Sequence, residues 1–584
     1  MEMGRIIQLK KTLNRQGIVL SILCFSFIIG CSQQPNEEPV DYFTIVRPEF
    51  TGKLAYETTD FVEDYWRVVG NTGFNKTIYL IADSLEASGY VLEEKAKEND
   101  RFTYRIEKRS MTHQTGEPVS ASLQIDGADK PLLLSDTNRN MTYLNSVSTP
   151  KKGLKTEVVW VKSLKDLESV SLKGKVVFAE MSARKLYKTA IGKGAIGILT
   201  YDNPAYLQPE KNTTSIQFRS LPAQDDDGFW GIALSYEAKE KLVAALKKGT
   251  TEILVNIQTK RYPSEELTIV ADIKGNELPN ERLVYSAHVQ EPGANDNGTG
   301  VGTQLEMART AARLFAEGKI DFKRTMTFLW GDEIISTRRY IQEDAQRANG
   351  IKWGISLDMV GENTSVTGGT FLIEKMPDPS AIWTRGKDKH SEWGGEVLKL
   401  ADMKPHYLND FIISNFKKQG EYANWVVETN PFEGSSDHTP FLQADIPGLL
   451  LWHFTDQFYH TDNDRIDKVS QETLKNVGTA ALVSGLELVN ASDVFVYNQI
   501  KKLKERANLR LEEEAKLSLL ALTKGSTRDK EKQIITAWEE WYVKALLSLN
   551  DVVPKENKTV QKAIKKALSE MSIEYEKQTK FLNE

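Results

Sequence analysis

Between residues 263 and 490, apolar stretches typical of buried strands alternate with stretches typical of helices. The strand candidates are residues 267–273, 282–288, 325–330 and 351–359, and the clearest helix candidate is 301–316. Such alternation predicts a mostly parallel sheet with helices on both faces. In sheets of this kind, binding sites gather at the carboxyl ends of the strands. The predicted fold class is therefore α/β, with any site placed where those strands end.

Metal-type side chains occur at these predicted strand ends. His288 and Asp358 lie at the ends of two apolar strand candidates, and Glu333 follows a third. Asp296 and His460 lie in the phrases GANDNGTG and YHTDND. Histidine is scarce in this chain, which has seven copies. Two imidazoles and three carboxylates match the needs of two zinc-like ions if one carboxylate bridges them. The set predicts a metal-dependent hydrolase.

Five short phrases, taken in order, resemble the co-catalytic zinc peptidase family M28, which includes aminopeptidases and glutamate carboxypeptidases. The phrases are SAHVQEPGANDNGTGVG (286–302), FLWGDE (328–333), ISLDMVG (355–361), GSSDHTPF (434–441) and YHTDNDRID (459–467). The resemblance implies that Asp296 bridges two divalent metal ions, which the family suggests are zinc. It further implies that His288 and Asp358 hold one ion, and that Glu333 and His460 hold the other.

The same resemblance implies roles in catalysis for two further residues. Asp332 occupies the position of the family's general base, usually a glutamate, which takes a proton from water and delivers it to the leaving amine. Tyr459 matches a tyrosine that hydrogen-bonds the oxyanion in some members. Gln290 stands where the family usually has an aspartate that orients the first imidazole, and its side-chain oxygen can still accept the imidazole N–H.

The predicted function is a metal-dependent exopeptidase, specifically an aminopeptidase that hydrolyses N-terminal residues of peptides. Selection for a free N-terminus needs an acidic group near the metals, and Glu362 and Asp437 are the candidates. The formal net charge of −6 argues against nucleic acid as a partner.

Three alternative functions stay open at this stage. A carboxypeptidase acting on acidic C-termini would need arginines in its pocket, and the candidates are Arg338, Arg339 and Arg385. A glutaminyl cyclase is a second enzymatic alternative on this fold. A peptidase-like binding protein is the non-enzymatic alternative, favoured only by Asp332 and Gln290, which depart from the family pattern.

The N-terminus is predicted to be an export signal. Basic residues precede the apolar run 18–30, which is too short to span a bilayer comfortably. The ending IIGC resembles a bacterial lipobox, which implies a lipoprotein signal peptide over 1–31 and a lipid on Cys31. The protein would then be exported and anchored to a membrane of the bacterial cell envelope, on its periplasmic or surface side. A plain signal peptide and an uncleaved anchor are the alternatives.

The other domain boundaries are predicted from changes in composition and hydrophobic pattern along the sequence. Residues 32–48 are predicted as a tether, 49–127 as the N-terminal part of the peptidase domain, and 263–490 as its catalytic part. Between them, residues 128–262 resemble a protease-associated domain in the phrases LKGKVVFAE, AIGKGAIGILTYDN and GIALSYEAKEKLVAALKKG, which implies an inserted α/β domain. Charged helical stretches over 491–584 predict a packed C-terminal extension or an element that forms a homodimer.

Overall fold

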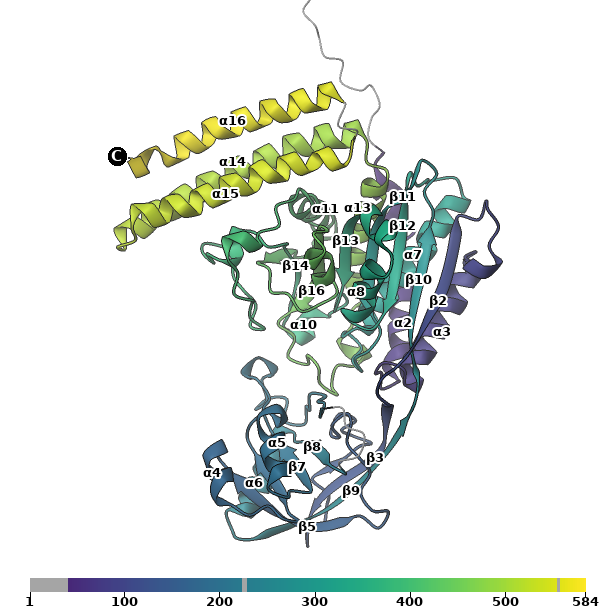
Figure 1. Cartoon of the computed structure of the whole chain (residues 1–584), viewed down its shortest axis with the longest axis vertical. Helices are drawn as coiled ribbons and strands as arrows, with labels where there is room; N and C mark the ends of the chain where they lie inside the picture. Colours follow the sequence, from purple (N-terminus) through teal and green to yellow (C-terminus); the bar gives the residue numbers. More distant parts are fainter. Residues whose placement is uncertain (1–39, 223–227, 554–556, 584) are drawn as a thin grey trace, which may run out of the picture. The chain divides into compact units, whose positions relative to one another are not determined.

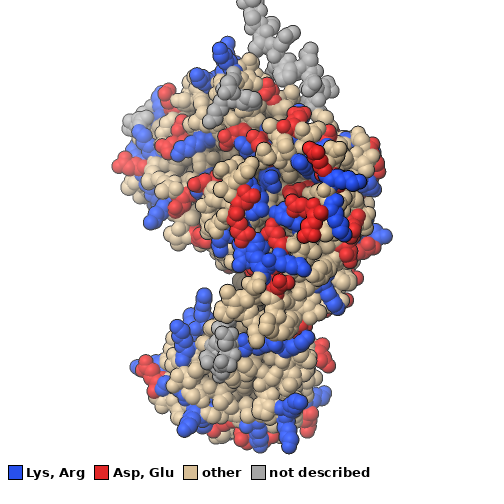
Figure 2. All heavy atoms as spheres, turned by 45° about the vertical axis from the view of Figure 1, so that its right-hand side comes forward, with Lys and Arg blue, Asp and Glu red and all other residues tan. Residues whose placement is uncertain are grey.

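The computed structural model describes residues 40–222, 228–553 and 557–583. The predicted signal peptide and Cys31 lie outside the described residues. Within them, two β-sheets and a set of long C-terminal helices make up the fold (Figure 1). On the face shown in Figure 2, Lys and Arg side chains are interspersed with Asp and Glu side chains. The absence of a nucleic-acid partner stays a prediction from the net charge.

The first sheet contains most of the predicted strands. Its members are β1 (Val91–Leu92), β2 (Phe102–Ser110), β10 (Glu265–Ile273), β11 (Leu278–His288), β12 (Arg324–Gly331), β13 (Ile351–Leu357), β14 (Thr370–Glu374), β15 (Glu428–Asn430) and β16 (Gly448–Phe454). The strand order is β1-β2-β10-β12-β11-β13-β16-β14-β15. The four central strands β12, β11, β13 and β16 run parallel, so their carboxyl ends meet at one edge. The predicted α/β fold is confirmed.

Helices cover both faces of this sheet, because successive residues of its central strands enter two different cores. Leu283 and Tyr285 of β11 join the large core, whereas Val284 between them joins a smaller core with Tyr340 and Phe441. The helices around the sheet are α1 (Tyr42–Val46), α2 (Lys53–Glu63), α3 (Thr72–Ala87), α7 (Gly298–Ala316), α8 (Ile335–Gln342), α9 (Ala345–Gly350), α10 (Thr364–Thr367), α11 (Leu408–Ala423), α12 (Thr439–Gln443) and α13 (Gln471–Val489).

Helix α1 lies inside the segment predicted as a tether. Its residues Phe43 and Val46 are fully buried in the large core. An apolar side chain that is removed from water in this way contributes to the fold. The packed part of the chain therefore begins before the predicted boundary at residue 49.

The second sheet is an insertion between β2 and β10. Its strands are β3 (Thr115–Ile125), β4 (Leu133–Leu134), β5 (Leu154–Val161), β6 (Val176–Ala179), β7 (Gly197–Thr200), β8 (Trp230–Ala233) and β9 (Thr251–Tyr262), in the order β4-β3-β9-β5-β6-β7-β8. The helices α4 (Leu164–Ser169), α5 (Ala183–Gly192) and α6 (Tyr236–Leu246) accompany it. The sheet has a core of its own. Since β3 belongs to it, the insert starts at Thr115, earlier than residue 128, and is defined below as residues 115–262.

Three long helices form the C-terminal region. They are α14 (Asp493–Thr523), α15 (Arg528–Ser548) and α16 (Lys558–Asn583), and they lie side by side (Figure 1). The helical extension is confirmed, and its use in a homodimer stays a prediction. Across the described residues, no single helix has the length and apolar character to cross a bilayer. Taken together, α13 and α14 meet that criterion by length and composition, with a bend of 120° between them.

Close helix packing beside the sheet depends on Gly302 of α7. A Cβ atom at this position would lie 2.3 Å from the carbonyl oxygen of Ala55 in α2. Because a backbone oxygen cannot move aside alone, we expect Gly302→Ala to lower the free energy of unfolding by about 1–3 kcal/mol. Denaturant titration measures this loss. Gly192→Ala is the control, since an added Cβ there meets no atom within 4 Å; equal stability of the two variants would contradict the close approach.

Candidate metal centre

The carboxyl ends of three neighbouring parallel strands carry predicted ligands. His288 is the last residue of β11 and pairs in register with Gly331, the last residue of β12. Glu333 follows two residues later, and Asp358 directly follows β13, on the other side of β11. Sheet pairing therefore brings together side chains that lie up to 70 residues apart in the sequence.

Four of the five predicted ligands form two overlapping groups. In the first, His288 Nε2 lies 3.2 Å from Asp358 Oδ1 and 3.9 Å from Asp296 Oδ1. In the second, His460 Nε2 lies 3.0 Å from Asp296 Oδ2. Asp296 thus directs one oxygen toward each imidazole, which is the arrangement that a bridging carboxylate needs.

Glu333, the fifth predicted ligand, belongs to neither group. Its Oε1 lies 4.0 Å from His288 Nε2, on the side of the first group. The second group contains Glu291 instead, with Oε2 at 3.3 Å from His460 Nε2. Glu291 was not among the ligands predicted from the sequence. Its signal was its place in the phrase SAHVQEPGAND, three residues after His288 and five before Asp296.

The residues present fit a bound cation. His288 Nε2, Asp296 Oδ1 and Asp358 Oδ1 are buried and have no hydrogen-bond partner among the described residues. Burial of a polar atom without a partner is costly, and buried charges in proteins are paired or coordinate metals. Burial, followed by repulsion from Glu291, raises the pKa of Asp296 well above its ordinary value. A divalent ion would give all three atoms a partner and offset the repulsion.

Local hydrogen bonds orient these side chains. The backbone carbonyl of Gln290 faces His288 Nδ1 at 3.2 Å and can accept its proton. The Gln290 side chain was expected to do this, but it is engaged with Glu333 instead. Its Oε1 accepts from the Glu333 backbone N–H at 2.9 Å, and its Nε2 donates to Glu333 Oε2 at 3.4 Å. Ser436 Oγ donates to Asp358 Oδ2 at 2.8 Å.

The turn that carries Asp296 is held by a buried carboxylate. Asp464 accepts from the backbone N–H groups of Asn295 and Asp296, at 2.9 and 3.0 Å. Asn297 caps helix α7, accepting from Gly300 N at 3.0 Å. Asp296 is therefore held on both sides, by Asp464 and by the cap of α7.

Backbone strain concentrates around the site. Five non-glycine residues in its loops have positive φ angles: Glu291 (84°), Ile334 (63°), Met359 (50°), Ser435 (67°) and His460 (61°). Such a conformation costs a residue other than glycine about 1–3 kcal/mol. Outliers of this kind cluster where a fold positions functional groups, so their placement supports the site as the functional centre.

Asp332, the predicted general base, is half-buried between other charged groups. Burial raises its pKa to about 7, and repulsion from Glu266 and Asp437 adds to the shift. Arg339 counteracts this, and it also forms an ion pair with Glu266. Asp332 belongs to neither metal-type group. Its role as proton acceptor stays a prediction.

Tyr459 lies against the second group. Its ring stacks on the His460 ring with 3.8 Å between the centroids. Burial, followed by repulsion from Asp296, raises the pKa of the phenol well above its ordinary value, so the hydroxyl stays protonated and can donate. This supports the predicted contact with an oxyanion, which stays a prediction.

Two other candidates, Glu362 and Asp437, are already engaged. Glu362 is fully buried and accepts from Thr367 Oγ1 at 2.5 Å and Asn295 Nδ2 at 3.3 Å. Asp437 accepts from the Ile334 backbone N–H, and so fixes the loop that follows Glu333. Neither acid is presented free for the amino group of a substrate.

The insert contacts the loop that carries His460. The Phe218 ring lies 4.5 Å from the His460 ring, and its backbone N–H donates to the His460 carbonyl at 2.9 Å. Gln217 Nε2 donates to the Tyr459 carbonyl at 3.1 Å. Asp462 accepts from the Ile216 backbone N–H at 2.9 Å. Residues 216–218 therefore support the second metal-type group, a contact that no sequence pattern indicated.

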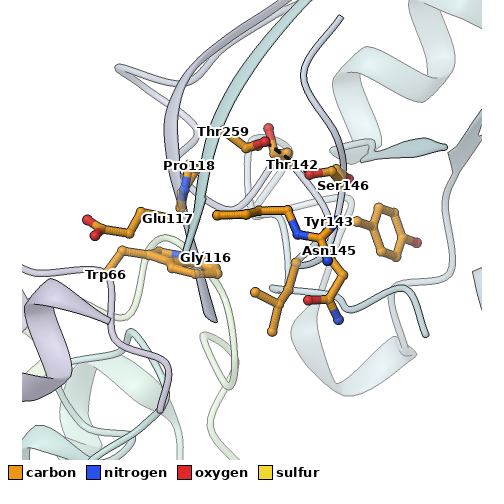
Figure 3. Close-up of a pocket in the computed structure, with 11 residues that line it drawn as sticks. Trp66, Gly116, Glu117, Pro118, Thr142, Tyr143, Asn145, Ser146 and Thr259 are labelled. Carbon is orange, nitrogen blue, oxygen red and sulfur yellow. Dashed lines mark hydrogen bonds between the residues drawn. The ribbon is translucent and has the colours of Figure 1, made fainter. Parts of the chain in front are cut away.

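A small cavity lies where the chain enters the insert (Figure 3). Its volume is about 20 Å³, and Trp66 lines it together with residues 116–118 and 142–146. Trp66 Nε1 donates to Asn140 Oδ1 at 3.1 Å. Asn140 Nδ2 in turn lies 3.4 Å from the His460 carbonyl oxygen. Trp66 is thus linked to the His460 backbone through Asn140.

Phe218→Ala tests this support. Removing the ring leaves the imidazole of His460 freer to turn, so we expect metal affinity to fall about 10–100-fold, as for other residues that orient a ligand. Calorimetric titration with zinc measures the change. Leu254→Ala, at a partly exposed position in β9 of the same insert, is the control. Equal zinc affinity in both variants would show that the contact does not orient His460.

Comparisons with known proteins agree with this site. Residues 268–484, which span the strand ends described above, match the model of peptidase family M28. The chain is 24% identical over 359 residues to aminopeptidase YwaD of Bacillus subtilis, covering 59% of this chain and 67% of that protein. It is 29% identical over 266 residues to an aminopeptidase of Pseudomonas aeruginosa, covering 42% of this chain and 45% of that protein.

Solved structures share the fold. One is BSAP, a zinc aminopeptidase from Bacillus subtilis, with a TM-score of 0.52, 18% identity, and coverage of 76% of this chain and 97% of that one. Another is a peptidase M28 precursor from Shewanella amazonensis, with a TM-score of 0.54, 16% identity, and coverage of 77% and 96%. Together with the family match, the paired histidine–carboxylate groups identify residues 268–484 as a peptidase family M28 domain.

Proposed function

We propose that this protein is a metal-dependent aminopeptidase. The observation that carries the proposal is the shared carboxylate of Asp296, which faces His288 in one metal-type group and His460 in the other. The M28 match and the aminopeptidases among its relatives support hydrolysis of peptides at the N-terminus.

Two zinc ions fit the proposal. His288, Asp358 and Asp296 would hold one ion, and His460 and Asp296 would help to hold the other. When bound, the ions would polarise the scissile carbonyl and lower the pKa of a water molecule. The neighbouring acids Asp332 and Glu333 are the residues available to move a proton from that water to the leaving amine. The protonated Tyr459 hydroxyl would donate to the oxygen that becomes negative.

The insert, with parallel strands β5 to β8 and the helices α5 and α6, would be a protease-associated domain, as its sequence phrases indicate. The N-terminal sequence supports export and a lipid at Cys31, which would anchor the enzyme to the cell envelope.

Digestion of a mixed peptide library by the purified zinc-loaded chain tests the function. We expect stepwise loss of N-terminal residues by mass spectrometry, and no loss when a chelator is present. C-terminal losses would instead indicate a carboxypeptidase, and loss of ammonia from N-terminal glutamine would indicate a cyclase. An unchanged library would refute the enzymatic proposal and leave a binding protein.

A further inference from the structure

We propose that Glu291, and not Glu333, completes the second half of the metal site. The inference rests on the proposed function, because it assigns a ligand within the same centre. Carboxylate and imidazole are both ordinary zinc ligands. With Glu291, each half of the site would contain one histidine, one carboxylate of its own and a share of Asp296.

The position of the Glu291 side chain supports this role. Its Oε2 lies 3.3 Å from His460 Nε2, and Glu291, Asp296 and His460 each offer a ligand atom within 4.8 Å of the others. The side chain is mostly buried, with 15% of its surface exposed. Two buried carboxylates, Glu291 and Asp296, directed at one imidazole repel each other unless a cation lies between them.

The backbone is built to direct Glu291 into the site. Glu291 has a φ of 84°, a left-handed conformation that a glutamate rarely adopts. Its N–H donates to the Arg67 carbonyl at 3.1 Å. The fully buried Arg67 guanidinium donates to Val289 O at 3.1 Å and to Gly293 O at 2.6 Å, on either side of Glu291. Arg67 therefore positions a turn whose strained residue is Glu291.

Glu333 is held in a different place by its own contacts. Gln290 binds both its backbone N–H and its carboxylate, and Asp437 accepts from the next backbone N–H. The nearest imidazole nitrogen is His288 Nε2 at 4.0 Å, while 23% of the Glu333 side chain is exposed. A carboxylate that is near the ligands, reachable by water and not itself a ligand is placed to handle a proton.

With Glu333 as the proton acceptor, the protons of the hydrolysis step balance. Glu333 would accept a proton from water while the water oxygen bonds to the scissile carbonyl carbon. The proton would then pass from Glu333 to the leaving nitrogen as the C–N bond breaks, which regenerates the carboxylate. The sequence-based alternative gives this step to Asp332 and a metal to Glu333.

Paired isosteric variants separate the two assignments. We expect Glu291→Gln to bind its most weakly held zinc ion about 10–100-fold more weakly than wild type, measured by metal analysis after dialysis and by calorimetry. Glu333→Gln should keep the wild-type zinc content and lose turnover. Glu291→Asp keeps a carboxylate and tolerates positive φ better, so it should recover part of the lost affinity.

The opposite pattern would overturn the proposal: wild-type zinc content in Glu291→Gln together with zinc loss in Glu333→Gln. Wild-type zinc content in both variants would overturn it as well. If Glu291→Gln fails to fold, Glu291→Asp decides, because it should bind its most weakly held zinc ion more weakly than wild type without losing that ion. Zinc affinity equal to wild type would contradict this expectation, and so would complete loss of that ion. Zinc binding is measured without peptide, so a wild type that cleaves nothing would refute the proposed function while leaving this ligand assignment standing.

Discussion

Replacement of the shared carboxylate is expected to have the largest effect on activity. In Asp296→Asn, an amide replaces the carboxylate that faces both His288 and His460, so neither half of the site keeps its full charge. Loss of the metals removes several kcal/mol of transition-state stabilisation, and we expect kcat/KM to fall about a thousandfold or more. Metal analysis of the dialysed variant should show zinc loss in parallel.

The melting temperature gives an independent test of this result. A neutral amide is less costly to bury than a carboxylate among other carboxylates, so in chelator Asp296→Asn should melt no lower than wild type. Added zinc should then raise the melting temperature of the wild type but not that of Asp296→Asn. Asp60→Asn, on the exposed face of α2, is the control and should behave as wild type. Zinc content in Asp296→Asn equal to wild type would contradict the bridging assignment.

The central strands and the residues that follow them could be predicted from the sequence, for a physical reason. Parallel strands buried on both faces are continuous apolar runs, and β12 is buried along its whole length. The polar residue that ends such a run is then placed at the sheet edge by the register itself. This is why His288 and Asp358 could be located before the structure was known.

Glu291 could not be found in this way, because its direction depends on long-range contacts. The turn that points it toward His460 is held by Arg67, more than 220 residues earlier in the chain. Among adjacent acids such as Asp332 and Glu333, sequence alone does not indicate which side chain turns toward the ligands. The contact between Phe218 and His460 was equally hidden, since it joins a loop of the insert to a loop that lies more than 200 residues later in the chain.

The largest expected effect on stability is that of Arg385→Ala. Arg385 was a candidate for binding substrate carboxylates, but its side chain is engaged by the C-terminal helices. Its Nε donates to Glu514 at 2.7 Å, and its other nitrogens donate to Glu531 at 2.6 Å and Ser518 at 3.0 Å. Both glutamates are almost fully buried. Glu514 keeps a second partner, Arg510, at 2.9 Å, but Glu531 loses its ion pair. We therefore expect a loss of about 3 kcal/mol in unfolding free energy, at the low end for breaking a buried pair.

Denaturant titration of three chains tests this expectation. Lys53→Ala breaks an exposed pair with Glu57 and should cost only about 0–1 kcal/mol. Adding Glu531→Gln to Arg385→Ala should restore part of the stability, because the variant then buries one charge fewer. A loss no larger than in Lys53→Ala would show that the C-terminal helices do not depend on this contact.

Because Arg385 donates to the helices, the end of the peptide that is cleaved should be the same in Arg385→Ala as in wild type. A change of cleaved end would instead return Arg385 to the substrate pocket and favour the carboxypeptidase alternative.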